Sequence, residues 1–156
     1  LADLIVNNKN EVAENAYLIE IEEDDLSNNI ASTKSEILAE PIEMFLSNAS
    51  FEKGEKIFKK CSACHTHKKD GENKVGPNLW NIINKPKGKS AGFNYSKELA
   101  EFGGVWTYEE MNQFLYKPKE YIKGTKMNFS GLKKVDDRAN LILYLRKLSD
   151  NPAILP

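Results

Sequence analysis

The chain has 156 residues, 40% of them hydrophobic and 10% aromatic, which suits one small domain with an extension. Its net charge of -1 conceals an acidic front, with 11 acidic and 2 basic residues up to Ser50, and a basic body with 12 acidic and 20 basic residues. No run of residues is long and apolar enough to cross a membrane, so an anchor is expected only upstream of Leu1. The dispersed lysines accompany no nucleic-acid motif, which disfavours nucleic-acid binding.

Residues 1–49 are predicted to form an acidic extension or tether that is partly extended or disordered, because asparagines and acidic residues give little drive to collapse. Tyr17–Glu22 is short and β-prone, which predicts an extended piece. Ile37–Leu46 could form a turn of helix with Pro41 in its first turn.

The compact domain is predicted to span residues 50–150 and to begin with a helix. Gly54, Ile57, Phe58 and Cys61 follow a helical period on one face, with lysines around the others. Gly54 costs this helix about 1 kcal/mol against alanine, which a close helix crossing would justify.

Further helices follow at longer intervals. Ser96 can cap a short helix that runs to Phe102, and Thr107-Tyr108-Glu109-Glu110 is a capping box for a helix that stops before Pro118. A last helix is predicted from near Asp136. Loops are predicted over residues 85–95 and 119–131, with a tail at 151–156. Because the domain is predicted to be helical at both ends and nothing in it resembles a parallel sheet, the expected fold class is all-α.

The central motif is Cys61-Ser62-Ala63-Cys64-His65, the attachment pattern of c-type haem. Two cysteines three positions apart can each bond one vinyl group of a porphyrin, and the adjacent imidazole then faces the iron. A thioredoxin-like site is disfavoured because βαβ units are missing from the predicted pattern. A zinc site with His67 is disfavoured because ligands this close cannot easily complete a tetrahedron.

A second iron ligand must come from elsewhere, and methionine opposite histidine is the pair of electron-transfer cytochromes. Met44 lies in the acidic front, and Met111 lies on a predicted helix face with Phe114, where a core role is simplest. Met127 lies in a glycine-bracketed loop that can be aimed at iron, so it is the favoured ligand, with a structural methionine as the alternative.

The chain resembles a class I c-type cytochrome of the mitochondrial and alphaproteobacterial kind. The motifs that carry the resemblance keep the family's order: Cys61-Ser62-Ala63-Cys64-His65, Gly76-Pro77-Asn78-Leu79, Gly92-Phe93-Asn94-Tyr95-Ser96, Trp106, Pro118-Lys119, Tyr121-Ile122, Gly124-Thr125-Lys126-Met127 and Leu141-Ile142-Leu143-Tyr144-Leu145. The acidic front and the Ser149-Asp150-Asn151-Pro152 ending further resemble the bacterial membrane-anchored subgroup.

The resemblance implies the cytochrome c fold, in which N- and C-terminal helices cross and long loops wrap one covalent haem c. The residues it implies for haem binding are Cys61, Cys64, His65, Pro77, Tyr95, Trp106, Thr125 and Met127. The cysteines would form the thioethers, and His65 and Met127 would be the metal ligands. The Pro77 carbonyl would orient His65, Tyr95 and Trp106 would hydrogen-bond a haem propionate, and Thr125 would brace the same side.

The resemblance also implies a function: a single-electron carrier of the respiratory chain, not an enzyme, from the cytochrome bc1 complex to cytochrome c oxidase. Attachment of haem c implies the periplasmic face of a bacterial inner membrane, with residues 1–49 tethering the domain to an anchor upstream of Leu1. The lysines expected around the haem edge, which would dock acidic partners, are Lys60, Lys68, Lys119, Lys126, Lys133 and Lys134. The alternatives are a soluble periplasmic donor to another reductase or peroxidase, and a haem enzyme or sensor from which Met127 dissociates.

Overall fold

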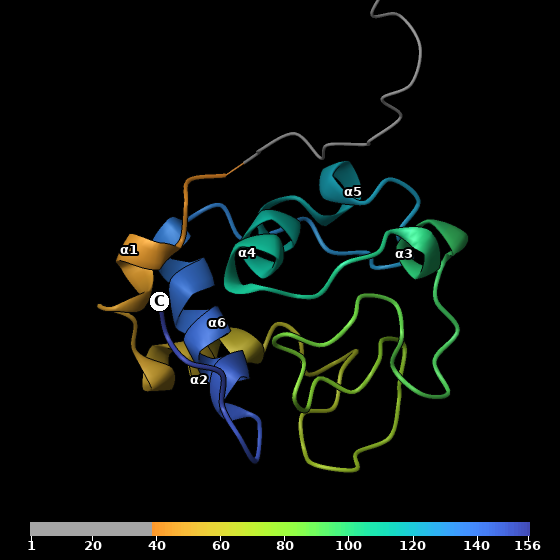
Figure 1. Ribbon diagram of the computed structural model, residues 1–156, viewed down its shortest axis with the longest axis horizontal. Coiled ribbons are helices and arrows are strands. Elements are labelled where there is room, and N and C mark those ends of the chain that lie inside the picture. The colour runs from red at the N-terminus through yellow and green to blue at the C-terminus, as the bar shows by residue number, and fades with distance from the viewer. Residues whose placement is uncertain (1–38) are drawn as a thin grey trace, which may run out of the picture. The chain divides into compact units, whose positions relative to one another are not determined.

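The computed structural model describes residues 39–156, so the extended piece predicted at Tyr17–Glu22 lies outside the described residues. Within this range there are six helices and no strand, apart from one isolated bridge between Pro86 and Val105 (Figure 1). The helices are α1 Glu43–Leu46, α2 Phe51–Phe58, α3 Lys97–Glu101, α4 Tyr108–Tyr116, α5 Pro118–Tyr121 and α6 Val135–Lys147. The predicted all-α class is confirmed.

The crossing of α2 and α6 forms one end of the domain (Figure 1). Ser50 caps α2 by accepting a hydrogen bond from the Lys53 N–H, and the Phe58 ring packs 5.2 Å from the Tyr144 ring of α6. Gly54 lies at the contact, where an added Cβ would overlap the Asn140 carbonyl oxygen and approach Tyr144 Cβ to 2.7 Å. The close crossing that would justify this glycine is therefore present.

The predicted caps of α3 and α4 are confirmed. The Ser96 hydroxyl accepts the Leu99 N–H at 3.3 Å, and the Thr107 hydroxyl accepts the Glu110 N–H at 3.1 Å. The Glu110 carboxylate accepts hydrogen bonds from Lys87 and Tyr121. In a capping box this carboxylate would accept the N–H of Thr107. Here it is bound instead by Lys87 and Tyr121, which lie outside α4.

The region after α4 differs from the prediction of a continuous loop over residues 119–131. The short helix α5 begins at Pro118, whose fixed φ suits the first helical position and whose missing N–H costs nothing there. Proline therefore ends α4 and starts α5, and the loop that carries Met127 begins only after Tyr121.

Residues 39–49, which the sequence places in the extension, pack against α4 and α6. Pro41 precedes α1, and Ile42 and Leu46 are 0% and 2% exposed within the hydrophobic core. Among the helices of residues 39–156, none is both long and apolar enough to cross a membrane.

Candidate haem site

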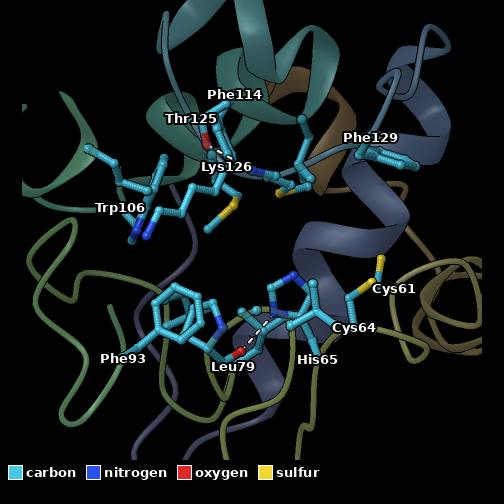
Figure 2. A pocket seen from close by; sticks show the side chains of 18 of the residues that line it. Cys61, Cys64, His65, Leu79, Phe93, Trp106, Phe114, Thr125, Lys126 and Phe129 are labelled. Carbon is cyan, nitrogen blue, oxygen red and sulfur yellow. Dashed lines mark hydrogen bonds between the residues drawn. The ribbon is translucent and has the colours of Figure 1, made fainter. Parts of the chain in front are cut away.

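One largely apolar cavity lies between the loops and the helices α4 and α6, and all eight predicted haem-binding residues line it (Figure 2). His65 and Leu79 lie on one side of the cavity, and Phe114, Thr125 and Lys126 lie across from them. Segments far apart in sequence are thus brought around a single space.

The attachment motif lies at the rim in a tight turn that follows α2. The N–H groups of Cys64 and His65 both donate to the Cys61 carbonyl oxygen at 3.0 Å. This turn places the two thiols and the imidazole together on one side of the cavity (Figure 2). Burial raises the pKa of the Cys61 thiol to about 11, despite the opposing effect of Lys60, so in the absence of bonded haem the group is a neutral thiol at pH 7.

His65 is held in one tautomer by its partner. Its Nδ1 lies 2.7 Å from the Pro77 carbonyl oxygen. Because a carbonyl can only accept, Nδ1 carries the proton and Nε2 keeps its lone pair. Burial lowers the pKa of His65, partly offset by the Pro77 hydrogen bond, so the ring is neutral at pH 7. A neutral imidazole with a free Nε2 is a metal ligand.

Gly76 allows this arrangement, a role that the sequence motif contained but did not reveal. A Cβ at Gly76 would lie 2.7 Å from His65 Nδ1 and closer still to the ring carbon between the nitrogens. The Gly76 N–H also donates to the Cys64 carbonyl oxygen at 2.8 Å. Only a residue without a side chain lets this backbone pass against the imidazole.

The methionine loop forms part of the opposite wall. Met127 lines the cavity, and its N–H donates to the hydroxyl of the buried Thr125 at 3.3 Å. Lys126 donates to the Asn94 carbonyl oxygen at 2.9 Å, which ties this loop to the one that carries Tyr95. Met111 lines the cavity as well, whereas Met44 is 82% exposed and takes no part.

Tyr95 and Trp106 supply polar groups to an otherwise apolar wall. The Tyr95 hydroxyl accepts the Ser90 N–H at 3.3 Å, which leaves its own hydrogen free to be donated. Trp106 is 5% exposed, with its ring 4.9 Å from Phe114. These two side chains fit the expected role of binding an acidic group of the ligand.

A half-buried ion pair that no sequence motif predicts lies beside Trp106. Lys87 is 3% exposed, pairs with Glu110, and lies 4.7 Å and 5.4 Å from the ring centres of Phe102 and Trp106. Tyr121 donates to the same carboxylate. Lys87 looks like any other lysine of the basic body, and no local pattern distinguishes it.

The donor set fits haem better than a bare metal ion. Among residues 39–156 no group of three or more His, Cys, Asp or Glu side chains is arranged to hold a metal. One neutral imidazole, two thioethers, two thiols and apolar walls suit a flat, mostly apolar group with an iron at its centre. A helical domain that wraps such a cavity, with Cys-x-x-Cys-His at its rim, defines a c-type cytochrome.

Comparisons with known proteins agree. The family model described as Cytochrome c matches residues 51–149. A "Cytochrome c homolog" of Bradyrhizobium diazoefficiens is 46% identical over 119 residues, which are 76% of this chain and 65% of that protein. A "Cytochrome c homolog" of Rickettsia felis is 37% identical over 146 residues, 94% of this chain and 82% of the relative. "Cytochrome c" of Chlamydomonas reinhardtii is 46% identical over 96 residues, 61% of this chain and 86% of the relative.

The chain therefore belongs to the cytochrome c family, of the alphaproteobacterial and mitochondrial kind. As a member it is an electron-transfer protein with covalently bound haem c, and it works with redox partners. The chain spans just under two thirds of the length of the Bradyrhizobium relative.

Proposed function

We propose that this protein carries single electrons from the cytochrome bc1 complex to a cytochrome c oxidase, with His65 and Met127 as the axial ligands of its haem. Cys61 and Cys64 are the attachment residues. The observation that carries the proposal is that His65, with Nε2 unprotonated, and the loop of Met127 face each other across one apolar cavity. Haem c, when bound, supplies an iron that takes up and releases one electron.

The surrounding side chains keep both ligands in place. Pro77 holds the proton on His65 Nδ1, and Gly76 fixes the distance of the backbone from the ring. Thr125 and the Lys126–Asn94 hydrogen bond restrain the methionine loop. Restraint on both sides favours the same geometry before and after electron transfer, so that little rearrangement opposes it.

Docking is proposed to use the positive surface at the cavity rim. Lys60 and Lys126 line the cavity and are exposed. Four other exposed lysines belong to the proposed set: Lys68, Lys119, Lys133 and Lys134. Dispersed positive charge of this kind attracts acidic partners and raises their association rate. This positive surface supports the proposal that the partner is an oxidoreductase, soluble or membrane-bound, with an acidic docking face.

The location is proposed to be the periplasmic face of a bacterial inner membrane. The support is chemical: haem c is attached to bacterial proteins outside the cytoplasm, and residues 1–38, with nine acidic and two basic residues, have a composition that suits a solvated tether. A tether that holds the carrier beside membrane partners raises its effective concentration. The test is whether the full-length gene product sediments with membranes and is released by cleavage within residues 1–38.

The ligand assignment is tested by exchanging the two methionines that line the cavity, one at a time. The near-infrared charge-transfer band between iron and methionine sulfur is recorded for the oxidised proteins, and carbon monoxide is added to the reduced ones. Met127→Leu should lose the band and bind carbon monoxide rapidly, because the sixth position is then open. Met111→Leu, the matched control, should keep the band and bind carbon monoxide slowly.

The opposite pattern would make Met111 the ligand. Rapid carbon monoxide binding by the unsubstituted protein would instead favour a haem enzyme or sensor over an electron carrier. The route between partners is tested separately, by reduction of the protein with purified bc1 complex and its oxidation by the oxidase. Failure of either reaction at low salt contradicts the proposed route.

A further inference from the structure

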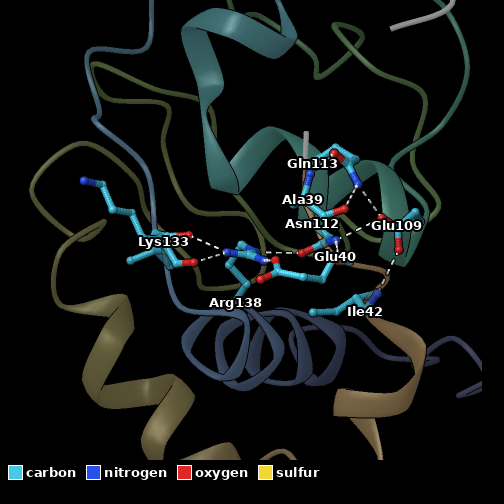
Figure 3. Close-up of polar contacts among 9 residues, drawn as sticks. Ala39, Glu40, Ile42, Glu109, Asn112, Gln113, Lys133 and Arg138 are labelled. Atoms are coloured by element: carbon cyan, nitrogen blue, oxygen red, sulfur yellow. Dashed lines mark hydrogen bonds and ion pairs between the residues drawn. The ribbon is translucent and has the colours of Figure 1, made fainter. Parts of the chain in front are cut away.

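Residues 39–42 are held by a row of polar side chains on one face of α4 (Figure 3). Gln113 accepts the Ala39 N–H at 2.9 Å and donates to the Ala39 carbonyl oxygen at 3.1 Å. Asn112 donates to the Glu40 carbonyl oxygen at 2.8 Å, and Glu109 accepts the Ile42 N–H at 3.0 Å. The helix thus binds the backbone at three of these four positions, Ala39, Glu40 and Ile42.

Apolar burial strengthens this attachment. Ile42 is 0% exposed and Leu46 2%, and both belong to the core that α4 and α6 share. Met44, two residues after Ile42, is 82% exposed. The segment therefore turns one side into the core and leaves the other in solvent, which is the pattern of a docked element.

Arg138 of α6 joins the segment to the rest of the domain. This guanidinium is fully buried, donates to the Glu40 carboxylate at 2.8 Å and donates to the Asn112 side-chain oxygen at 2.7 Å. It also donates to the carbonyl oxygens of Leu132 and Lys133, both at 2.8 Å. Four segments meet at one side chain: residues 39–42, α4, α6 and the end of the methionine loop.

The opposite face of α4 lines the haem cavity. At about 3.6 residues per turn, Met111, Phe114 and Leu115 point away from the face that holds residues 39–42. The Leu115 carbonyl oxygen also accepts the Leu132 N–H at 2.8 Å, where the methionine loop returns to the core. Two connections therefore lead from the docked segment to the Met127 side of the cavity, one through α4 and one through Arg138.

We propose that residues 39–46 are a brace that positions α4 and the end of the methionine loop, and so holds Met127 in its place. Ile42 and Glu40 are its positioning residues. The inference rests on the proposed role of Met127 as an axial ligand and goes beyond it, because it assigns a role at the haem to part of the acidic front. Loosening the brace should let the methionine loop open more often while the haem stays attached.

The test measures the rate of carbon monoxide binding to the reduced, native full chain, since the ligand enters only when methionine leaves the iron. Ile42→Ala removes the buried anchor, and Met44→Ala is the matched control in the same segment. The cavity left by Ile42→Ala destabilises the packing of residues 39–46, and part of that loss of stability should favour opening of the methionine loop. We therefore expect Ile42→Ala to raise the rate of carbon monoxide binding about tenfold. Met44→Ala should leave it unchanged, and Ile42→Val should recover most of the wild-type rate.

A purely structural role for the segment gives a different result. Ile42→Ala would then lower the denaturant midpoint, yet bind carbon monoxide as slowly as Met44→Ala under native conditions, and the proposal would be overturned. Glu40→Gln, a change at a side chain 60% exposed, serves if Ile42→Ala does not fold. It should raise the rate by a smaller factor, and an unchanged rate would equally overturn the brace. Fast carbon monoxide binding by the wild type would instead refute Met127 as the iron ligand. This outcome distinguishes a failure of the proposed function from a failure of the brace.

Discussion

Replacing Gly54 with alanine tests the helix crossing on which the haem attachment motif depends. A Cβ at Gly54 would overlap the Asn140 carbonyl oxygen of α6 and lie 2.7 Å from Tyr144 Cβ. Neither atom is at the end of a flexible side chain, so α2 must move away from α6. The Asn140 side chain also accepts the Ser50 N–H at 2.7 Å, so a shift of α2 would strain its first turn too.

The magnitude follows from two opposing effects. Overpacking against backbone costs about 3 kcal/mol, at the upper end of the usual range. Alanine recovers about 1 kcal/mol of helix propensity. The net loss in free energy of unfolding is about 2 kcal/mol, which corresponds to a fall of about 4–8 °C in the thermal midpoint.

The assay is guanidinium unfolding of the holoprotein, followed by circular dichroism. Glu55→Ala, at the adjacent exposed position of α2, is the control and should change stability by less than about 0.5 kcal/mol. If Gly54→Ala is as stable as the wild type, or more stable, α2 and α6 do not approach as described and the reasoning fails.

Three further predictions concern charged groups. A hydrogen bond from its own backbone N–H, and then one from Arg138, hold the pKa of Glu40 below its ordinary 4.5. Its stabilisation is therefore complete above about pH 4.5 and lost as the pH falls through the lowered value, so acid titration should erase the stability difference between wild type and Glu40→Gln. Lys87→Met should lower the free energy of unfolding, measured by chemical denaturation, by about 1–2 kcal/mol, because Glu110 loses its ion pair but stays partly solvated. An unchanged free energy of unfolding would show that the pair does not stabilise the fold. Raising ionic strength from low to moderate should slow electron transfer to the oxidase in stopped flow, and a flat or rising rate would contradict docking by lysines.

Local signals in the sequence account for the parts that were predicted correctly. Ser96 and Thr107 act as caps because capping involves residues only three positions away. Gly54 could be interpreted because a glycine inside an amphipathic helix is costly unless another helix crosses there. The cavity residues were predictable because a family resemblance already carries the three-dimensional information that spacing alone lacks.

The parts that were missed depend on distant partners. Arg138 binds Glu40 across 98 residues, and no period or motif connects the two positions. One signal did exist: Arg138 is one of only two arginines in a chain with 20 lysines, and arginine suits buried, multiply bonded sites. The helix α5 has no signal of its own apart from Pro118, which indicates the end of the preceding helix as well as the start of a new one.

A haem held by His65 and Met127 can be detected directly with two spectra of the purified full chain. The oxidised protein is scanned in the near infrared, and a reduced-minus-oxidised difference is recorded in the visible. We expect a c-type haem difference spectrum together with an iron–methionine band that vanishes in Met127→Leu. A c-type haem whose near-infrared spectrum has no methionine band in the wild type would contradict it.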